Sequence, residues 1–382
     1  MSQPDGRPSR QFRFTGIEAA RGIAATLVVA NHCIHTLGSA RNFGTPPFGL
    51  LFQFGRSGAD LFFVLSGFLI ALIHWGDVGR PDRLKHYFAR RITRIYPTYW
   101  LVIIALIPVD VITHTLYDRY DRPMEVVKAI FLLPQDTTLL EVTWSLRNEL
   151  LFYVLFGLLI LNRAFGAGVL LVWIALMALR PVLASDLDEP WFNLLTYPMN
   201  FEFVAGMAAG WALVRGKIAR PLPLLIAGMA IFVGFAVAED RQLLWTREPH
   251  LWFAGTEWGI LTLRCLGYGT AAVLMIAGLT VLEMRGRLVM PGFLVRLGGA
   301  SYLLYLIHVP MLIAMGAGER HVRLLRFMPG WLLGSAGIAA IVATALAVHA
   351  WIERPLLRAV RPRPTNFSGK SRPALGPPET AS

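Results

Sequence analysis

The amino-acid sequence predicts an all-α polytopic membrane protein with about ten transmembrane helices and both termini in the cytoplasm. Its 382 residues are 55% hydrophobic and only 16% charged, and the mean hydropathy is +0.52. Soluble domains average about 25% charged residues, which they need for a polar surface. This chain is therefore expected to hide its apolar side chains in lipid, where one span takes about 20 apolar residues.

Apolar stretches of spanning length recur along the chain, and each predicts one transmembrane helix. They fall at residues 16–37, 48–75, 95–115, 142–162, 167–184, 194–214, 221–238, 258–282, 298–316 and 330–351. The apolar segment 123–134 is too short to cross a bilayer, so we expect a re-entrant or interfacial piece there. One membrane domain is predicted over 16–360, between a cytoplasmic tail at 1–15 and a disordered cytoplasmic tail at 361–382.

The net charge of +12 suits either a nucleic-acid partner or a basic cytoplasmic surface. Arg and Lys are about twice as frequent in the loops on one side of the predicted spans, which is typical of cytoplasmic loops. This asymmetry places both termini inside the cell and accounts for most of the charge without nucleic acid. Cys33 and Cys265 lie in apolar segments with no CxxC or Cys/His cluster, so neither a disulfide framework nor a metal site is predicted.

Ionisable residues inside the spans are the candidates for function, because each costs at least about 2.5–3.5 kcal/mol to insert into a bilayer. In the first span, Arg21 and His32 are eleven residues apart and share one helical face. Their separation along the axis is about 16 Å, with Arg21 near the cytoplasmic end. The alternative is that Arg21 extends to the lipid headgroups and His32 caps the helix end.

The second span carries Asp60 and Ser66, although Ser66-Gly67 alone is better explained as a close contact between membrane helices. The basic connection after it holds Arg91 and Arg94, one turn apart at the start of the third span. Paired guanidinium groups match phosphate oxygens. A basic segment beside the membrane also serves as a topology signal or binds lipid headgroups, so both interpretations stay open here.

The fourth span begins with Trp144 and carries Ser145, Glu149 and Tyr153 on one stripe, at spacings of four residues. Glu149 must find its partner on another helix. A structural ion pair with an arginine such as Arg21 or Arg56 is the alternative to a catalytic role.

In the ninth span, His308 stands two residues before Pro310. A proline in a membrane helix frees a backbone carbonyl, and His308 could simply satisfy such local groups. The segment Glu353-Arg354-Pro355 closes the last span on the cytoplasmic side, where it is expected to cap the helix or form an ion pair.

Together these segments resemble the integral-membrane acyltransferase-3 family, which includes bacterial polysaccharide O-acetylases and some antibiotic acylases. The resemblance covers about residues 12–360, and each motif is weak alone but specific in this order. The motifs are Arg21 with Asn31-His32; Gly58-Ala59-Asp60 through Ser66-Gly67-Phe68; Arg91 and Arg94 with Tyr96-Pro97; Trp144-Ser145, Glu149 and Phe152-Tyr153; Ser301-Tyr302, Tyr305 and His308; and Glu353-Arg354-Pro355.

The resemblance implies a multi-pass protein of the bacterial inner membrane that transfers an acyl group, most often acetyl, from cytoplasmic acyl-coenzyme A to a hydroxyl. The acceptor is commonly a sugar, and the partners are then acyl-coenzyme A, a carbohydrate and the bilayer. It also implies that Arg21 and His32 are essential and that Arg91 and Arg94 contact the donor. Glu149 matches a recurrent acidic position.

As an enzyme, the chain would use His32 as the base for the acceptor hydroxyl, with Glu149 orienting it or pairing with it. Arg21 would stabilise charge or hold the donor, acetyl-coenzyme A. Asp60, Ser66, Trp144 and His308 are assigned to substrate binding, and no metal is expected.

Two other classes of function remain open at this stage. Buried Arg, His and Glu also occur in transporters and flippases, although we find no inverted repeat in the sequence. A non-catalytic membrane protein could use the basic face to bind lipid. For the enzyme, a small secondary metabolite is the alternative acceptor.

Overall fold

The computed structural model describes residues 14–37, 47–48, 51–113, 123–135, 140–183, 189–241, 243, 257–321 and 328–360. Within these ranges the chain is helical and contains no strand, which confirms the predicted all-α class. Seven helical segments among these described residues are long and apolar enough to cross a membrane by length and composition. The predicted tail at 361–382 and most of the tail at 1–15 lie outside the described residues.

Each predicted span overlaps a helix of the structure. The helices are α1 (Thr15–Leu37), α2 (Ser57–His74), α3 (Leu84–Thr113), α4 (Pro123–Ile130), α5 (Thr143–Leu161), α6 (Arg163–Leu183), α7 (Pro190–Thr196), α8 (Asn200–Val214), α9 (Pro221–Asp240), α10 (Glu257–Arg264), α11 (Thr270–Met284), α12 (Gly292–His321), α13 (Gly330–Val348) and α14 (Arg354–Val360). A π-helical turn at Cys265–Gly269 joins α10 to α11, and another at His349–Glu353 joins α13 to α14.

Three predicted spans are not among the seven segments: those of α1, α3 and α8. Helix α8 has only 15 residues, because the span expected from 194 is interrupted at Tyr197-Pro198. Tyr197 has a ψ of 127°, the extended conformation that a following proline favours. Helix α3 begins eleven residues before the predicted span, since its basic first turns are helical as well. The expected count of ten is thus supported only in part.

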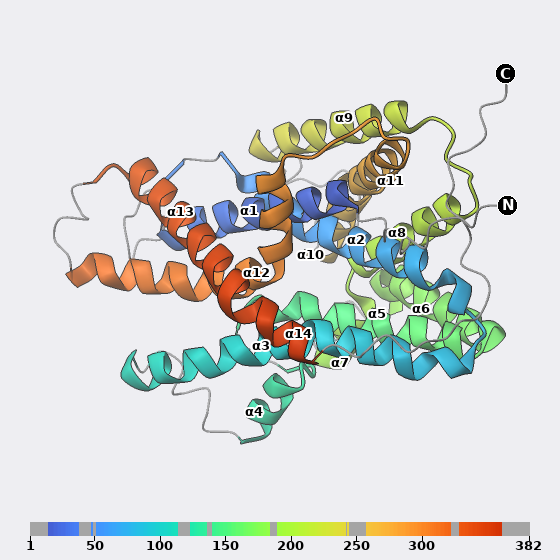
Figure 1. Ribbon diagram of the computed structural model, residues 1–382, viewed down its shortest axis with the longest axis horizontal. Coiled ribbons are helices and arrows are strands. Elements are labelled where there is room, and N and C mark those ends of the chain that lie inside the picture. The colour runs from blue at the N-terminus through green and yellow to red at the C-terminus, as the bar shows by residue number, and fades with distance from the viewer. Residues whose placement is uncertain are drawn as a thin grey trace, which may run out of the picture.

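The axes of most long helices lie roughly along one line (Figure 1). Helix α1 packs against α12, α2 against α8 and α9 against α11. The first helix is fixed at its start by Glu283, whose carboxylate accepts hydrogen bonds from the backbone N–H groups of Thr15 at 2.6 Å and Gly16 at 2.9 Å. These two N–H groups have no partner inside the helix, so the carboxylate satisfies them. Arg21 and His32 are thereby held on one continuous α1, as the sequence predicts.

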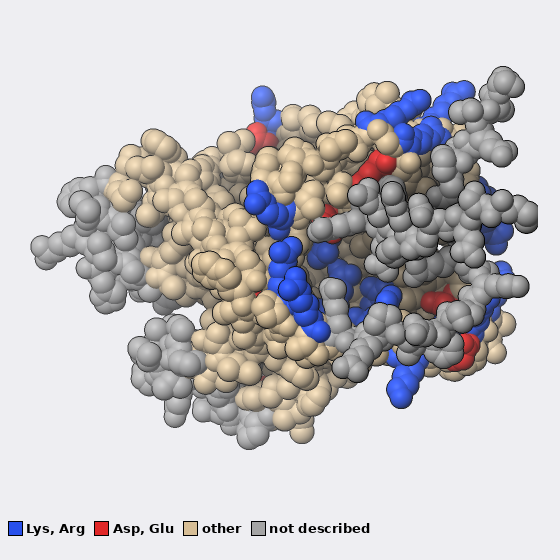
Figure 2. All heavy atoms as spheres, viewed as in Figure 1, with Lys and Arg blue, Asp and Glu red and all other residues tan. Residues whose placement is uncertain are grey.

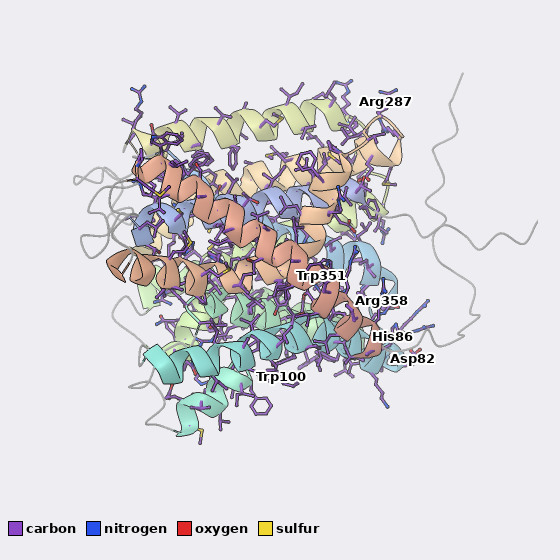
Figure 3. All side chains as sticks on the ribbon, turned by 60° about the vertical axis from the view of Figure 1, so that its left-hand side comes forward. Asp82, His86, Trp100, Arg287, Trp351 and Arg358 are labelled. Atoms are coloured by element: carbon purple, nitrogen blue, oxygen red, sulfur yellow. The ribbon has the colours of Figure 1, made fainter. Side chains whose placement is uncertain are left out.

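Charged side chains gather at one end of the helices. The ionisable residues Asp82, His86, Arg287 and Arg358 all lie there, although they come from two separate connections and from the segment after the last predicted span (Figure 3). Lys and Arg side chains also gather on this side of the surface, around a hollow beside α14 (Figure 2). We call this the basic end of the molecule.

Close contact between α1 and α12 gives the first prediction. A Cβ atom at Gly298 would lie 1.8 Å from the carbonyl oxygen of Glu18, so Gly298→Ala must force α1 and α12 apart. We expect it to lower the free energy of unfolding by about 1–3 kcal/mol. Gly292→Ala on the same helix meets nothing within 4 Å and should be neutral or slightly stabilising. Thermal unfolding of both variants in nanodiscs measures this, and equal midpoints would contradict the close packing.

Candidate active site

Two cavities meet between α1, α3 and α12. The larger, which we call the basic cavity, has a volume of about 560 Å³ and is lined by Glu18, Arg21, Arg94, Gly299, Tyr302, His349, Glu353, Arg354, Leu357 and Arg358. The smaller, the inner pocket, has a volume of about 50 Å³ and is lined mainly by apolar residues of α2, α5 and α12, with Ser66, Ser145 and Glu149. Arg21, Arg94 and Tyr302 line both, so the two cavities are contiguous.

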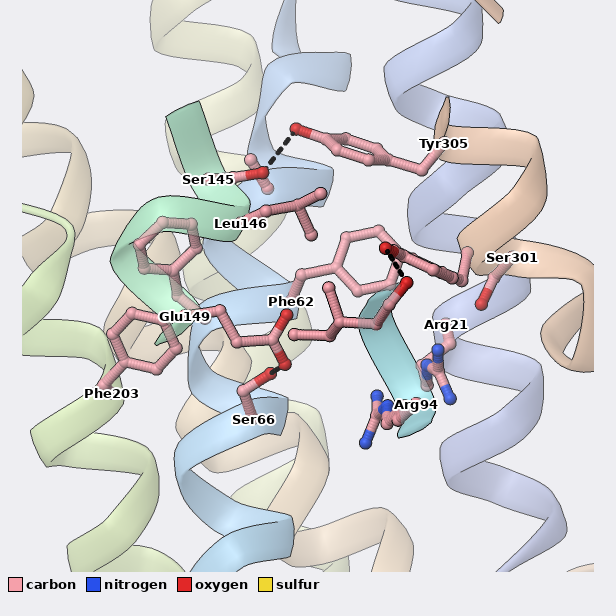
Figure 4. A pocket seen from close by; sticks show the side chains of 14 residues that line it. Arg21, Phe62, Ser66, Arg94, Ser145, Leu146, Glu149, Phe203, Ser301 and Tyr305 are labelled. Carbon is pink, nitrogen blue, oxygen red and sulfur yellow. Dashed lines mark hydrogen bonds between the residues drawn. The ribbon is translucent and has the colours of Figure 1, made fainter. Parts of the chain in front are cut away.

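Arg21 and Arg94 stand where the basic cavity meets the inner pocket. Their side chains lie close together at one end of the pocket, across from Ser145 and Tyr305 (Figure 4). The two positive charges repel each other. Among the acidic groups, Glu149 attracts Arg21 most strongly. Within the described part of the chain, neither guanidinium has a hydrogen-bond or ion-pair partner. Both therefore offer free donors to an anion that enters the cavity.

Glu149 is held by hydroxyl groups on its own helix and on α2. Its carboxylate accepts a hydrogen bond from Ser66 Oγ at 2.9 Å and another from the hydroxyl of Tyr153. The predicted stripe on α5 is thus confirmed, with Ser145 and Glu149 facing the inner pocket. The alternative partner Arg56 contacts Glu239 instead, at 3.5 Å.

His32 and His308 form a pair from α1 and α12. Their ring centroids are 4.9 Å apart, and His308 Nε2 lies 3.4 Å from His32 Nδ1. His308 is fully buried, and its ring centroid lies 5.6 Å from that of Tyr305, which lines the inner pocket and shares a 2.9 Å hydrogen bond with Ser145. The two histidines therefore lie just beyond the inner pocket, behind Tyr305, at the end opposite Arg21 and Arg94.

The partners of the two rings fix their tautomers. His308 Nδ1 lies 2.7 Å from the carbonyl oxygen of Tyr305, and a carbonyl only accepts, so this nitrogen carries the proton. In the neutral ring His308 Nε2 is then an acceptor. His32 Nδ1 faces that acceptor and the carbonyl oxygen of Val28 at 3.0 Å, so it is the donor. His32 Nε2 is left with its lone pair, which is what a general base requires.

Comparison with known proteins decides the family. The profile described as "Acyltransferase domain" matches residues 14–350. The chain belongs to the acyltransferase-3 family. It is 31% identical to the "Exopolysaccharide production protein ExoZ" of Rhizobium meliloti (strain 1021) over 342 residues, which are 82% of this chain and 92% of the relative. No solved structure matches the chain. The protein is therefore a membrane acyltransferase that moves groups other than aminoacyl groups.

Arg91 occupies a different position in this acyltransferase from that of Arg94. Its side chain is only 6% exposed and lies over the rings of Tyr87 and Tyr153, at 5.7 and 5.5 Å from their centroids. It lines neither the basic cavity nor the inner pocket. The hydroxyl of Tyr153 donates a hydrogen bond to Glu149, so Arg91 reaches the site only indirectly, through its contact with the Tyr153 ring. The structure thus brings Arg94, but not Arg91, to the place where a donor could bind.

Asp60 lies outside the inner pocket, in a buried group of charged residues. It forms an ion pair with Arg264 at 3.4 Å. Its carboxylate, that of Glu202 and the thiol of Cys265 have potential ligand atoms within 4.8 Å of one another, a spacing that could hold a metal ion. The sequence gives no sign of this group because its members come from three helical segments. The positive charge of Arg264 opposes a cation there, so we assign the group to charge balance between helices.

Sequence reasoning missed part of the basic cavity. Arg354, Arg358 and His349 line it, whereas only a cap or ion pair was expected at the end of the last span. Glu353 does contact a basic residue, because it accepts a hydrogen bond from His349 Nδ1, and it also accepts one from Thr98 Oγ1 of α3 at 2.8 Å. The two arginines are four residues apart and share a helical face, which is the one signal in the sequence that could have indicated their common position.

Trp144, the last of the predicted substrate residues, lines neither of these two cavities. Its indole stacks on Phe63 and faces Tyr197, with centroid distances of 5.8 and 5.3 Å. It borders a separate cavity on the other side of α5.

Proposed function

We propose that this acyltransferase moves an acetyl group from cytoplasmic acetyl-coenzyme A to a hydroxyl of a carbohydrate, such as an exported polysaccharide or its lipid-linked precursor. The observation that carries the proposal is the pair of guanidinium groups, Arg21 and Arg94, which have no partner among the described residues and lie between a wide basic cavity and a narrow inner pocket. The name of the relative, an exopolysaccharide production protein, supports the carbohydrate acceptor. We place the protein in the bacterial inner membrane with its basic end and both termini in the cytoplasm.

The donor site follows from the shape and charge of the two cavities. Coenzyme A has phosphate groups at one end and a long thin arm that ends in the thioester. The phosphates fit the basic cavity, where Arg21 and Arg94 supply forked donors and Arg354 and Arg358 add positive charge at the mouth. We place the arm along the line of the largely apolar inner pocket, which leads from these arginines toward Tyr305 and the histidine pair. Its volume of about 50 Å³ is too small for the arm, so the lining side chains must move apart when the donor binds.

Transfer needs a base at the far end of this path. His32 Nε2 removes the proton from the acceptor hydroxyl, and the hydroxyl oxygen attacks the carbonyl carbon of the thioester. The C–S bond then breaks, and the coenzyme thiolate takes the proton back from His32. His308 acts as a positioning residue. Its Nε2 accepts from His32 Nδ1 and so favours the tautomer of His32 whose own Nε2 is basic.

Arg21 belongs to the donor end of this path. It lies about 16 Å from His32 along α1, which is too far to stabilise charge on the reacting carbonyl. We therefore assign Arg21 to the coenzyme phosphates and Glu149 to the balance of charge between Arg21 and Arg94. Ser66 holds Glu149 in that position.

The direct test is transfer of radiolabelled acetyl groups from acetyl-coenzyme A to glycans in membranes that contain the full chain. Acetylation of a saccharide hydroxyl, with release of free coenzyme A, is the expected result. Membranes with the His32→Ala variant supply the background. If label reaches the saccharide only from a donor other than acyl-coenzyme A, the donor assignment is wrong. If coenzyme A is released without any acylated saccharide, the acceptor assignment is wrong.

Removing one donor-binding arginine should weaken acetyl-coenzyme A binding specifically. Arg94→Gln loses charge-assisted hydrogen bonds, each of about 1.5–3 kcal/mol, so KM for acetyl-coenzyme A is expected to rise at least about 10-fold. Arg163→Gln removes the same charge from the exposed start of α6 and should leave KM unchanged. Steady-state kinetics in nanodiscs measure both variants. An equal rise in the two variants would mean that only the overall charge matters.

A further inference from the structure

A third cavity lies across α5 from the inner pocket. It has a volume of about 480 Å³ and is lined by Pro134, Gln135, Trp144, Arg147, Asn148, Pro190, Asn193, Leu194 and Tyr197; we call it the α5–α7 cavity. It shares no lining residue with the inner pocket or the basic cavity. Trp144, Arg147 and Asn148 face it from the first turns of α5, while Ser145 and Glu149 on the same turns face the inner pocket.

Three polar atoms at this cavity are buried without a hydrogen-bond partner in the described part of the chain. They are Gln135 Oε1, Arg147 Nε and Asn148 Oδ1, and their side chains are only 7%, 8% and 4% exposed. The other ends of two of them are engaged, because Arg147 Nη1 donates to the carbonyl of Gln135 at 3.4 Å and Asn148 Nδ2 donates to that of Trp144 at 2.8 Å. Buried polar atoms are nearly always paired, so three orphaned atoms on side chains that line one cavity indicate a partner that the described residues do not supply.

The chemistry of these groups defines that ligand. The side-chain amide oxygens of Gln135 and Asn148, which have no partner among the described residues, accept hydrogen bonds, so they suit hydroxyl groups. Arg147 is the one charged residue among those that line the cavity, which favours a ligand with a negative group. Trp144 and Tyr197 add aromatic surface, with ring centroids 5.3 Å apart. Aromatic surface beside a few fixed polar groups is typical of a site for a small polar ring.

We propose that the α5–α7 cavity binds an acidic saccharide unit of the acceptor. The carboxylate of the sugar pairs with Arg147, its hydroxyls donate to Gln135 and Asn148, and its ring packs on Trp144. This inference rests on the proposed function and deepens it, since it names the class of carbohydrate. The unit bound here is not the one that reacts, because α5 separates it from the inner pocket. Binding of a remote unit orients the hydroxyl that does react.

Direct binding without the acyl donor tests the site. The full chain in nanodiscs of neutral lipid is titrated, by calorimetry, with a disaccharide that contains glucuronate and with a neutral disaccharide of the same size. The wild type is expected to bind the acidic disaccharide at least about 10-fold more tightly. Arg147→Gln should abolish this preference, whereas Arg163→Gln, which removes an exposed arginine from α6, should keep it. Equal affinity for the two sugars, or an unchanged preference in Arg147→Gln, overturns the proposal.

A second variant covers the case in which Arg147→Gln does not fold. Asn148→Asp keeps the shape of the side chain but places a negative charge beside the sugar carboxylate, so affinity for the acidic disaccharide should fall at least about 10-fold. An unchanged affinity again overturns the site. Failure of the proposed function is seen separately, because binding of the acidic disaccharide that persists without any acetyl transfer from acetyl-coenzyme A contradicts the reaction and leaves the site standing.

Discussion

Replacing His32 with alanine is expected to lower the rate of acetyl transfer at least about 100-fold, because general-base catalysis contributes about 10²–10⁴-fold. The loss should fall on kcat. Arg21, which we propose binds the donor, lies about 16 Å away along α1, with Arg94 beside it, so KM for acetyl-coenzyme A should stay near that of the wild type. Single-turnover release of coenzyme A in nanodiscs separates the chemical step from binding.

His35→Ala is the matched control for this prediction. His35 lies one turn further along α1, and its side chain is exposed, whereas that of His32 is half-buried against His308. The control should keep its activity. Full activity in His32→Ala, or an equal loss in both variants, would rule out His32 as the base.

The parts of this site that lie within one helix were predictable from the sequence. Arg21 and His32 share a face of α1 because the helix runs unbroken from Thr15 to Leu37, and helical periodicity then fixes their relation. The stripe of Ser145 and Glu149 on α5 follows from the same rule. Such relations depend only on local geometry.

Relations between helices were not predictable in this way. The approach of His308 to His32 depends on the packing of α12 against α1, and that of Arg94 to Arg21 depends on α3. Arg91 shows the limit within one helix. Three residues turn the helix by about 300°, so Arg91 points about 60° away from Arg94, enough to bury it against Tyr153.

The fold, like the site, has features that the local sequence predicts and others that it does not. Apolar run lengths predicted the helices, but the break before α8 depends on the local effect of Pro198 on Tyr197. The placement of Arg354 and Arg358 depends on how α14 lies against the rest of the chain, which no local pattern fixes.

Replacing Glu149 with glutamine is expected to destabilise the protein without ligand and to make coenzyme A a stronger stabiliser. Glu149 attracts both Arg21 and Arg94, which otherwise repel each other across the narrow junction of the two cavities. Removing the charge of Glu149 weakens its charge-assisted hydrogen bonds from Ser66 and Tyr153 and leaves the two arginines uncompensated. We expect the free energy of unfolding to fall by about 1.5–3 kcal/mol. The glutamine keeps the shape of the side chain and an oxygen that can accept from Ser66.

The phosphates of coenzyme A should take over the role of the missing carboxylate. A ligand that binds only the folded state stabilises it by RT ln(1 + L/Kd), where L is the free ligand concentration, so at one ligand concentration a tighter complex gives a larger rise in the unfolding midpoint. We therefore expect coenzyme A to raise the midpoint of Glu149→Gln more than that of the wild type. Glu141→Gln, at an exposed position two turns before Glu149, should behave as the wild type in both measurements. An equal rise in Glu149→Gln and the wild type would show that the carboxylate and the coenzyme phosphates do not act on the same pair of arginines.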